Sequence, residues 1–149
     1  MLEKRIEQDL KTALLAGDRL KIDTLRSIKS ALLYYKVEKG KRDSGLNHEE
    51  EIAVIAKESK KRSESADLYI KGGNQEKAAT ELAEKKIIDQ YLPEQLSEDE
   101  LLEIILATIK DLRVDDQSAM GKVIAAVKQK TGGAANGGLI ARLVKENLK

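Results

Sequence analysis

The sequence predicts an all-α, multihelical fold in two subdomains. Apolar residues recur at three- and four-residue steps along most of the chain, and no segment shows the alternating pattern of a strand. Cys, Trp and Phe are absent from the 149 residues, so the core must consist of aliphatic side chains, which suits helix-on-helix packing. Pro93, the only proline, ends a helix near Leu92. Four helices are expected before it and a compact three-helix unit after it.

The helices before Pro93 are expected to span residues 2–15, 20–39, 48–71 and 75–92. Gly17 suits a helix C-terminus, and Asp18 and Asn47 are typical N-cap residues. The apolar spacing predicts an inward stripe for each helix. These stripes are Leu2, Ile6, Leu10 and Leu14; Leu25, Ile28, Leu32 and Tyr35; Ile52, Ile55, Ser59, Ser63, Ala66 and Ile70; and Ala79, Ala83, Ile87 and Tyr91.

The third of these helices is unusually polar in its middle, where residues 57–65 are nine consecutive polar residues. A helix that is polar around most of its surface either bridges two modules or contacts a partner. The run includes four bases, Lys57, Lys60, Lys61 and Arg62. Two glutamates in the same run reduce the net positive charge of this basic patch, so a solvated face is the simpler interpretation.

The helices after Pro93 are expected at residues 98–112, 118–131 and 137–148, and Ser97 with Glu100 has the spacing of a capping box. The predicted subdomains are therefore residues 1–96 and 97–149. The buried positions of the second subdomain are expected to be Leu101, Ile105, Ile109, Leu112, Met120, Val123, Ile124, Val127, Ile140, Leu143, Val144 and Leu148.

Charge is distributed unevenly along the chain, although its net value is only +1. Residues 94–116 carry −6 and residues 117–149 carry +5, which favours an electrostatic partner for the C-terminal part. No run approaches the ~18 apolar residues of a membrane span, and the first residues lack the apolar stretch of a signal peptide. We therefore expect a soluble cytoplasmic protein without a membrane partner.

The sequence offers no catalytic constellation. His48 is the only histidine and falls in the first turn of a predicted helix, where a solvated side chain is expected. Without cysteine, one histidine cannot form the usual transition-metal cluster, and the serines lack a neighbouring base. Asp115 and Asp116 have the positions of loop and capping residues. We expect no catalytic residue, metal or cofactor, and no enzymatic activity of the chain on its own.

Glycines cluster between the last two predicted helices, in residues 132–138. Such a loop lets backbone N–H groups converge on a helix N-terminus, where a phosphate can bind. A helix C-cap followed by an N-cap explains the same residues without a ligand. The flanking helices carry five bases, Lys122, Lys128, Lys130, Arg142 and Lys145. Without interleaved aromatics, these bases suit shape recognition of structured RNA, with a solvated face as the alternative.

Five segments follow one another in a specific order. They are Thr-Leu-Arg at 24–26, Ser-Ala-Leu at 30–32, Tyr-Leu-Pro-Glu-Gln-Leu at 91–96, Met-Gly-Lys-Val at 120–123 and the glycine-rich stretch at 133–139. The series resembles the GatB/YqeY family, which includes stand-alone YqeY proteins and the C-terminal tail of the B subunit of the tRNA-dependent amidotransferase. The resemblance spans essentially the whole chain. It implies an all-α fold in which the tail, residues 97–149 here, contacts the outer corner of tRNA.

The resemblance also adds motif residues to the candidate interface, although family members commonly have aspartate at the position of Asn136. The expected nucleic-acid-binding residues are Gly121, Lys122, Lys128, Lys130, Gly133, Asn136, Gly137, Arg142 and Lys145.

The expected function is a non-catalytic accessory protein of translation that binds tRNA. The resemblance also implies association with carbon–nitrogen ligase activity that uses glutamine as amido-N-donor. One alternative is therefore an accessory component of that activity within a complex, with an amidotransferase or an aminoacyl-tRNA synthetase as partner. A second alternative is a helical protein–protein interaction module that uses residues 57–65.

Overall fold

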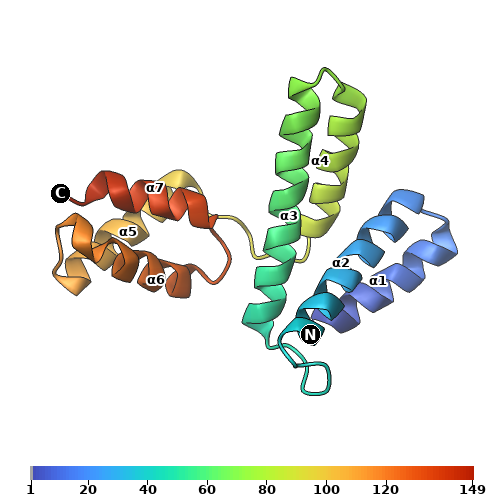
Figure 1. Cartoon of the computed structure of the whole chain (residues 1–149), viewed down its shortest axis with the longest axis horizontal. Helices are drawn as coiled ribbons and strands as arrows, with labels where there is room; N and C mark the ends of the chain where they lie inside the picture. Colours follow the sequence, from blue (N-terminus) through green and yellow to red (C-terminus); the bar gives the residue numbers. More distant parts are fainter. Residues whose placement is uncertain (1) are drawn as a thin grey trace. The chain divides into compact units, whose positions relative to one another are not determined.

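The structure is a computed structural model that describes residues 2–149. All regular secondary structure in this range is helical (Figure 1). The elements are α1 (Leu2–Ala16), α2 (Arg19–Glu38), α3 (His48–Lys71), α4 (Gln75–Asp89), α5 (Glu98–Leu112), η1 (Gln117–Ala119), α6 (Met120–Thr131) and α7 (Gly137–Asn147). The predicted all-α fold is confirmed, with four helices before Pro93 and three α-helices after it. None of the helices in residues 2–149 has the length and apolarity needed to cross a bilayer.

The predicted N-caps form as expected. The Asn47 side chain accepts a hydrogen bond from the Glu50 N–H at 2.8 Å, and the Ser97 hydroxyl accepts one from the Glu100 N–H at 3.1 Å. Ser97 also donates to the Glu100 carboxylate at 3.0 Å, so the two residues cap the N-terminus of α5. These local bonds satisfy N–H groups that a helix leaves without a partner in its first turn.

The chain divides into two compact units, one ending at Leu92 and the other beginning at Pro93. In the second unit, the Leu96 N–H donates to the Ala134 carbonyl at 2.8 Å, so residues 93–96 are attached to the loop between α6 and α7. The assignment of residues 1–96 and 97–149 to two subdomains stays a prediction.

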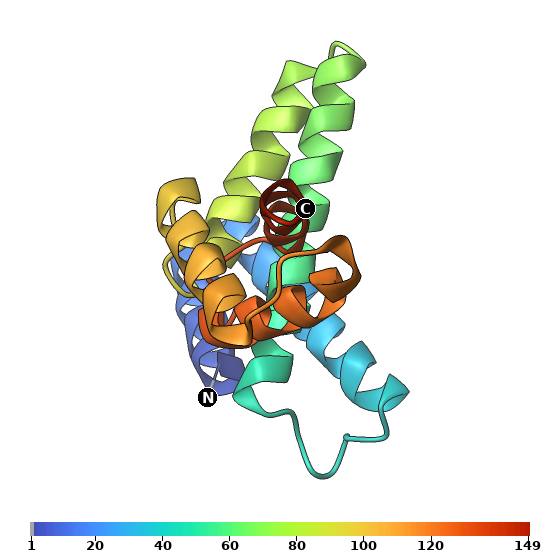
Figure 2. The same cartoon turned by 90° about the vertical axis from the view of Figure 1, so that its left-hand side faces the viewer.

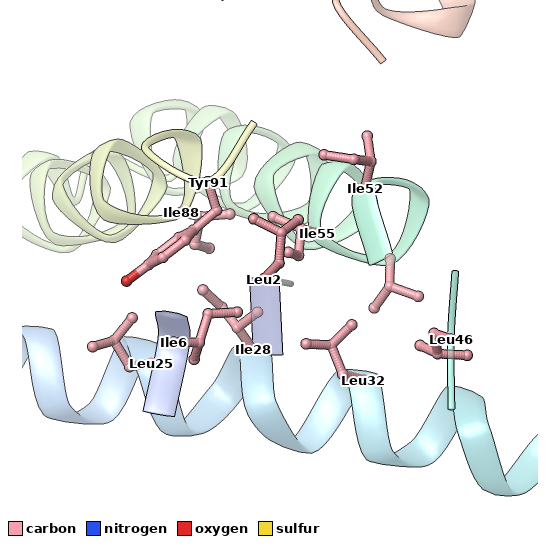
Figure 3. Close-up of a cluster of buried hydrophobic side chains, with 11 residues drawn as sticks. Leu2, Ile6, Leu25, Ile28, Leu32, Leu46, Ile52, Ile55, Ile88 and Tyr91 are labelled. Atoms are coloured by element: carbon pink, nitrogen blue, oxygen red, sulfur yellow. The ribbon is translucent and has the colours of Figure 1, made fainter. Parts of the chain in front are cut away.

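The core of the first unit forms where α1, α2 and the first half of α3 meet the end of α4 (Figure 3). Its buried side chains are Leu2, Ile6, Leu25, Ile28, Leu32, Leu46, Ile52, Val54, Ile55, Ile88 and Tyr91. Tyr91 is 3% exposed, donates its hydroxyl proton to the Asp9 carboxylate and lies under the Arg5 guanidinium, 4.9 Å from the ring centroid. Tyr91 therefore connects α1 to the end of the first unit.

Two residues in the polar middle of α3, Ser59 and Arg62, face the neighbouring helices. The Ser59 hydroxyl is buried and donates to Asp89 of α4. The Arg62 side chain is 16% exposed and donates to Glu84 of α4 and to the Ser27 hydroxyl of α2, both at 2.8 Å. Arg62 is thus part of a polar network inside the unit and does not belong to the predicted basic patch on α3. Lys57, Lys60 and Lys61 are exposed.

Three predicted stripe positions are wrong. Leu14 is 47% exposed and Ile70 51% exposed, while Ala13 is buried. In α4, the inward residues are Ala78, Ile88 and the following Tyr91, whereas Ala79 is exposed. The inward face of α4 differs from the prediction because Glu81 and Glu84 lie on the same stripe as Ala78 and Ile88. Both glutamates face Arg62 of α3. Figures 1 and 2 show α3 and α4 side by side along this contact.

The environment of Tyr91 predicts a pH dependence. Burial and, next, the hydrogen bond to Asp9 raise the pKa of Tyr91 above its usual 10.0. A raised pKa stabilises the fold below the unfolded pKa of about 10, and this contribution disappears as the pH rises through the folded value. The difference in unfolding free energy between the wild type and Tyr91→Phe is therefore expected to shrink above about pH 10. Urea titrations between pH 8 and 11 measure it, and a constant difference would contradict this account.

The second unit has its own aliphatic core, shared by α5, α6 and α7. Its buried side chains are Leu101, Ile105, Val123, Val127, Ile140, Leu143, Val144 and Leu148. The other predicted core positions of this unit, Ile109, Leu112, Met120 and Ile124, are partly buried against it. The core of this unit is therefore confirmed as predicted, and the candidate site residues lie on α6, on α7 and in the loop between them.

Candidate nucleic-acid interface

The loop between α6 and α7 is shaped by left-handed glycines and an asparagine cap. Gly132 ends α6 with φ +54°, and Gly133 follows with φ +92°. The Asn136 side chain accepts hydrogen bonds from the N–H groups of Gly138 at 2.7 Å and Leu139 at 3.3 Å. Within residues 2–149, the Gly137 N–H has no hydrogen-bond partner. The start of α7 therefore presents a backbone donor at the positive end of the helix.

Lys128 places a cation at this helix start. A Cβ atom added to Gly137 would lie 3.5 Å from Lys128 Cε and 3.6 Å from its Nζ. The ammonium group thus lies beside the α7 N-terminus, within van der Waals distance of where a side chain at position 137 would begin. Four of the predicted residues, Lys128, Gly133, Asn136 and Gly137, are brought together at this end of the unit.

The same loop is held by residues that the sequence analysis did not assign to the site. Gln95 Nε2 donates to the Gly133 carbonyl at 3.1 Å, beside the Leu96–Ala134 backbone bond. The signal was present, because Gln95 and Leu96 belong to the proline motif at 91–96. These contacts fix the glycine loop to the first residues of the second unit.

Gly121, Lys122 and Lys145 belong to the opposite end of the unit. Gln117 Nε2 donates to the carbonyls of Lys145 at 3.0 Å and Leu148 at 2.9 Å, which brings the region before α6 to the end of α7. Lys122 and Lys145 are exposed there. The predicted bases therefore do not form one cluster: Lys122 lies about 9 Å before Lys128 along α6, and Lys145 lies in the last turn of α7.

Arg142 and Lys130 are engaged by acids. Arg142 donates to Glu98 at 2.9 Å and to Glu146 at 3.1 Å, and the hydrogen bond to Glu98, followed by that to Glu146, raises its pKa. Lys130 donates to the Thr108 hydroxyl at 3.0 Å and lies 3.8 Å from Asp111. These exposed pairs are weak individually, yet each one must open or rearrange before the base meets a phosphate.

The other residues considered in the sequence are placed as predicted. His48 is exposed at the start of α3. Asp116 is a capping residue, because its carboxylate accepts bonds from the Ser118 hydroxyl and N–H, which lower its pKa. Among residues 2–149, no three His, Cys, Asp or Glu side chains gather into a group suited to a metal ion.

Two glycines of the second unit are expected to respond oppositely to alanine. Gly132→Ala forces a side chain into φ +54° and should cost about 1 kcal/mol. Gly121 lies inside α6, where an added Cβ meets nothing within 4 Å, so Gly121→Ala should stabilise by about 0.5–1 kcal/mol. Urea unfolding of the two variants tests this, and the same sign for both would refute the assignment.

A family model described as Yqey-like protein matches residues 3–148. No curated protein gives a match.

Proposed function

The chain belongs to the YqeY-like protein family, and from this premise we propose that it is a cytoplasmic, non-catalytic accessory protein that binds tRNA through its second unit. The protein recognises the phosphate backbone of a folded RNA. The bases of the tRNA need not be read, because the second unit contains no aromatic residue on which they could stack.

The observation that carries this proposal is the pairing of Lys128 with the α7 N-terminus. An unpartnered N–H at Gly137, the positive helix end and an ammonium group meet at one exposed point. Each of these features favours an anion, and the glycines let a phosphate approach the backbone closely.

The second anchor is the exposed pair of lysines at the far end of the unit. Lys122 and Lys145 contact further phosphates in the proposed complex. Lys122 lies about 15 Å along α6 from Gly132, a spacing that a rigid RNA backbone can match. Arg142 and Lys130 contribute less, because Glu98, Glu146 and Asp111 already neutralise them.

Anisotropy of labelled total tRNA tests the proposal. With about four phosphate contacts, the affinity should fall roughly 50- to 150-fold between about 50 and 200 mM salt. Loss of most binding in this interval supports backbone recognition. No binding at about 50 mM salt would refute the proposed function.

A further inference from the structure

A groove lies between α2 and α3 in the first unit, far along the chain from the glycine loop. Its volume is about 680 Å³, and it is lined by the second half of α2 and the first half of α3. Small residues form much of its walls, with Ser30 and Ala31 on α2 and Ala53 on α3, and the buried Val54 lines it as well. Tyr34, which is 74% exposed, stands at its edge.

The dimensions of the groove suit an α-helix. The residues that line it from the α2 side run from Ser27 to Lys39, the C-cap of the helix, which is roughly 18 Å or about three helical turns. Small wall residues let the ridge of another helix enter at close interaxial distance. A helix also satisfies its own backbone hydrogen bonds, whereas an irregular segment would press unpaired polar groups against Ala31, Ala53 and Val54.

The rim of the groove is basic on both walls. Lys39 stands on the α2 side, and Lys57 and Lys61 stand on the α3 side, all exposed. Glu58 is 12% exposed and lies 3.2 Å from Lys61 and 3.4 Å from Arg62. Lys61 is therefore already paired, and Lys39 and Lys57 provide the available positive charge of the rim. Only Glu38 remains as an exposed acid in the lining. The charge around an apolar floor therefore complements a helix with one apolar stripe and acidic flanks.

We propose that this groove binds an acidic amphipathic helix of a partner protein. The apolar stripe of that helix packs on Ala31, Ala53 and Val54, and its carboxylates meet Lys39 and Lys57 on the two walls. The proposal is independent of tRNA binding, because the two sites lie in different units. A nucleic-acid strand fits less well, since its phosphates would pass over the small apolar residues of the floor.

Amide NMR of the full-length protein with a synthetic helical peptide tests the proposal. The peptide carries leucines at i, i+3, i+4 and i+7 and glutamates on the flanks, and its scrambled isomer is the control. We expect shifts confined to α2 and α3, with a Kd on the order of 100 µM or tighter. Absence of shifts at about 1 mM, or equal shifts with the scrambled isomer, would overturn the proposal.

Variants separate the groove from general charge effects. Ala53→Arg blocks the groove, and Lys57→Glu reverses one positive charge of its rim. Each should raise the Kd for the peptide by roughly tenfold or more. Lys11→Glu, at an exposed α1 position outside the groove, makes the same charge change and should leave the Kd within about twofold. Circular dichroism verifies that all three remain folded.

Two further results would assign the groove to another occupant and so overturn the proposal. Concentration-dependent shifts of the groove amides without peptide would mean that a second copy of the chain binds there. Weaker tRNA binding by Ala53→Arg, with peptide affinity unchanged, would mean that RNA occupies the groove. Intact peptide binding in a protein that binds no tRNA would refute the proposed function alone.

Discussion

Replacing Tyr91 by alanine is expected to destabilise the first unit by about 3–5 kcal/mol, the cost of removing a large buried aromatic side chain. Tyr91 is 3% exposed and belongs to the core that joins all four helices of the unit. The change also leaves the Asp9 carboxylate without its hydroxyl donor and removes the ring beneath Arg5. The midpoint and slope of urea unfolding, followed by circular dichroism, measure the loss.

Two controls divide this loss into its parts. Tyr91→Phe keeps the ring and removes only the hydrogen bond to Asp9, so it should cost about 1–3 kcal/mol. Tyr34→Ala removes an aromatic ring that is 74% exposed and should change stability by no more than about 0.5 kcal/mol. A Tyr91→Ala variant as stable as Tyr34→Ala would show that Tyr91 is not a core residue.

Reversing the charge of three exposed lysines of the second unit, Lys122, Lys128 and Lys145, is expected to weaken tRNA binding at least about 100-fold near physiological salt. The variant combines Lys122→Glu, Lys128→Glu and Lys145→Glu, each of which removes a phosphate contact and adds a repulsive charge. The slope of log affinity against log salt should fall by about 2–3, because that many fewer counterions are released. Anisotropy titrations at several salt concentrations measure both quantities.

A charge-matched control tests whether position matters. Lys11→Glu, Lys71→Glu and Lys86→Glu change the net charge equally at exposed positions of the first unit, and this triple variant should retain binding within a fewfold of the wild type. Equal losses in the two triple variants would show that binding responds to net charge alone, and the proposed site would be withdrawn.

Arg142 offers a more selective test of the interface. Its guanidinium is already bonded to Glu98 and Glu146, so Arg142→Gln should weaken tRNA binding by less than about threefold. Lys128→Gln, which loses the same charge beside Gly137, should have the larger effect. The reverse order would mean that Arg142 leaves its acids to bind phosphate.

The helices themselves could be predicted because their signals are local. Caps such as Asn47 and Ser97, and the apolar steps of α5 to α7, depend on residues within one or two turns. The inward face of α4 could not be predicted in the same way. Glu81 and Glu84 have the composition of a solvent face, yet they turn toward Arg62 of α3. A polar pair between helices reverses the rule that charges point outward, and no spacing within α4 reveals it.

The candidate site was predictable in part for the same reason. The glycine loop and its asparagine cap follow from residues 132–138 alone, whereas the neighbours of Arg142 do not. Glu98 lies 44 positions away in the sequence and meets Arg142 only through the packing of α5 on α7. The sequence showed opposite charges in adjoining segments, and only the structure shows which base each acid neutralises.

The partly buried Arg62 network has a consequence for how the α3–α4 hairpin can align. Aliphatic and alanine stripes alone would tolerate a shift of α4 along α3 by one turn, since similar side chains recur every four residues. Such a shift would separate Arg62 from Glu84 and would leave the buried Ser59 hydroxyl without its Asp89 acceptor. A buried hydroxyl without a hydrogen-bond partner costs about 1–3 kcal/mol. The network thus excludes the slipped register, and it selects one alignment of two helices that hydrophobic packing alone would leave ambiguous.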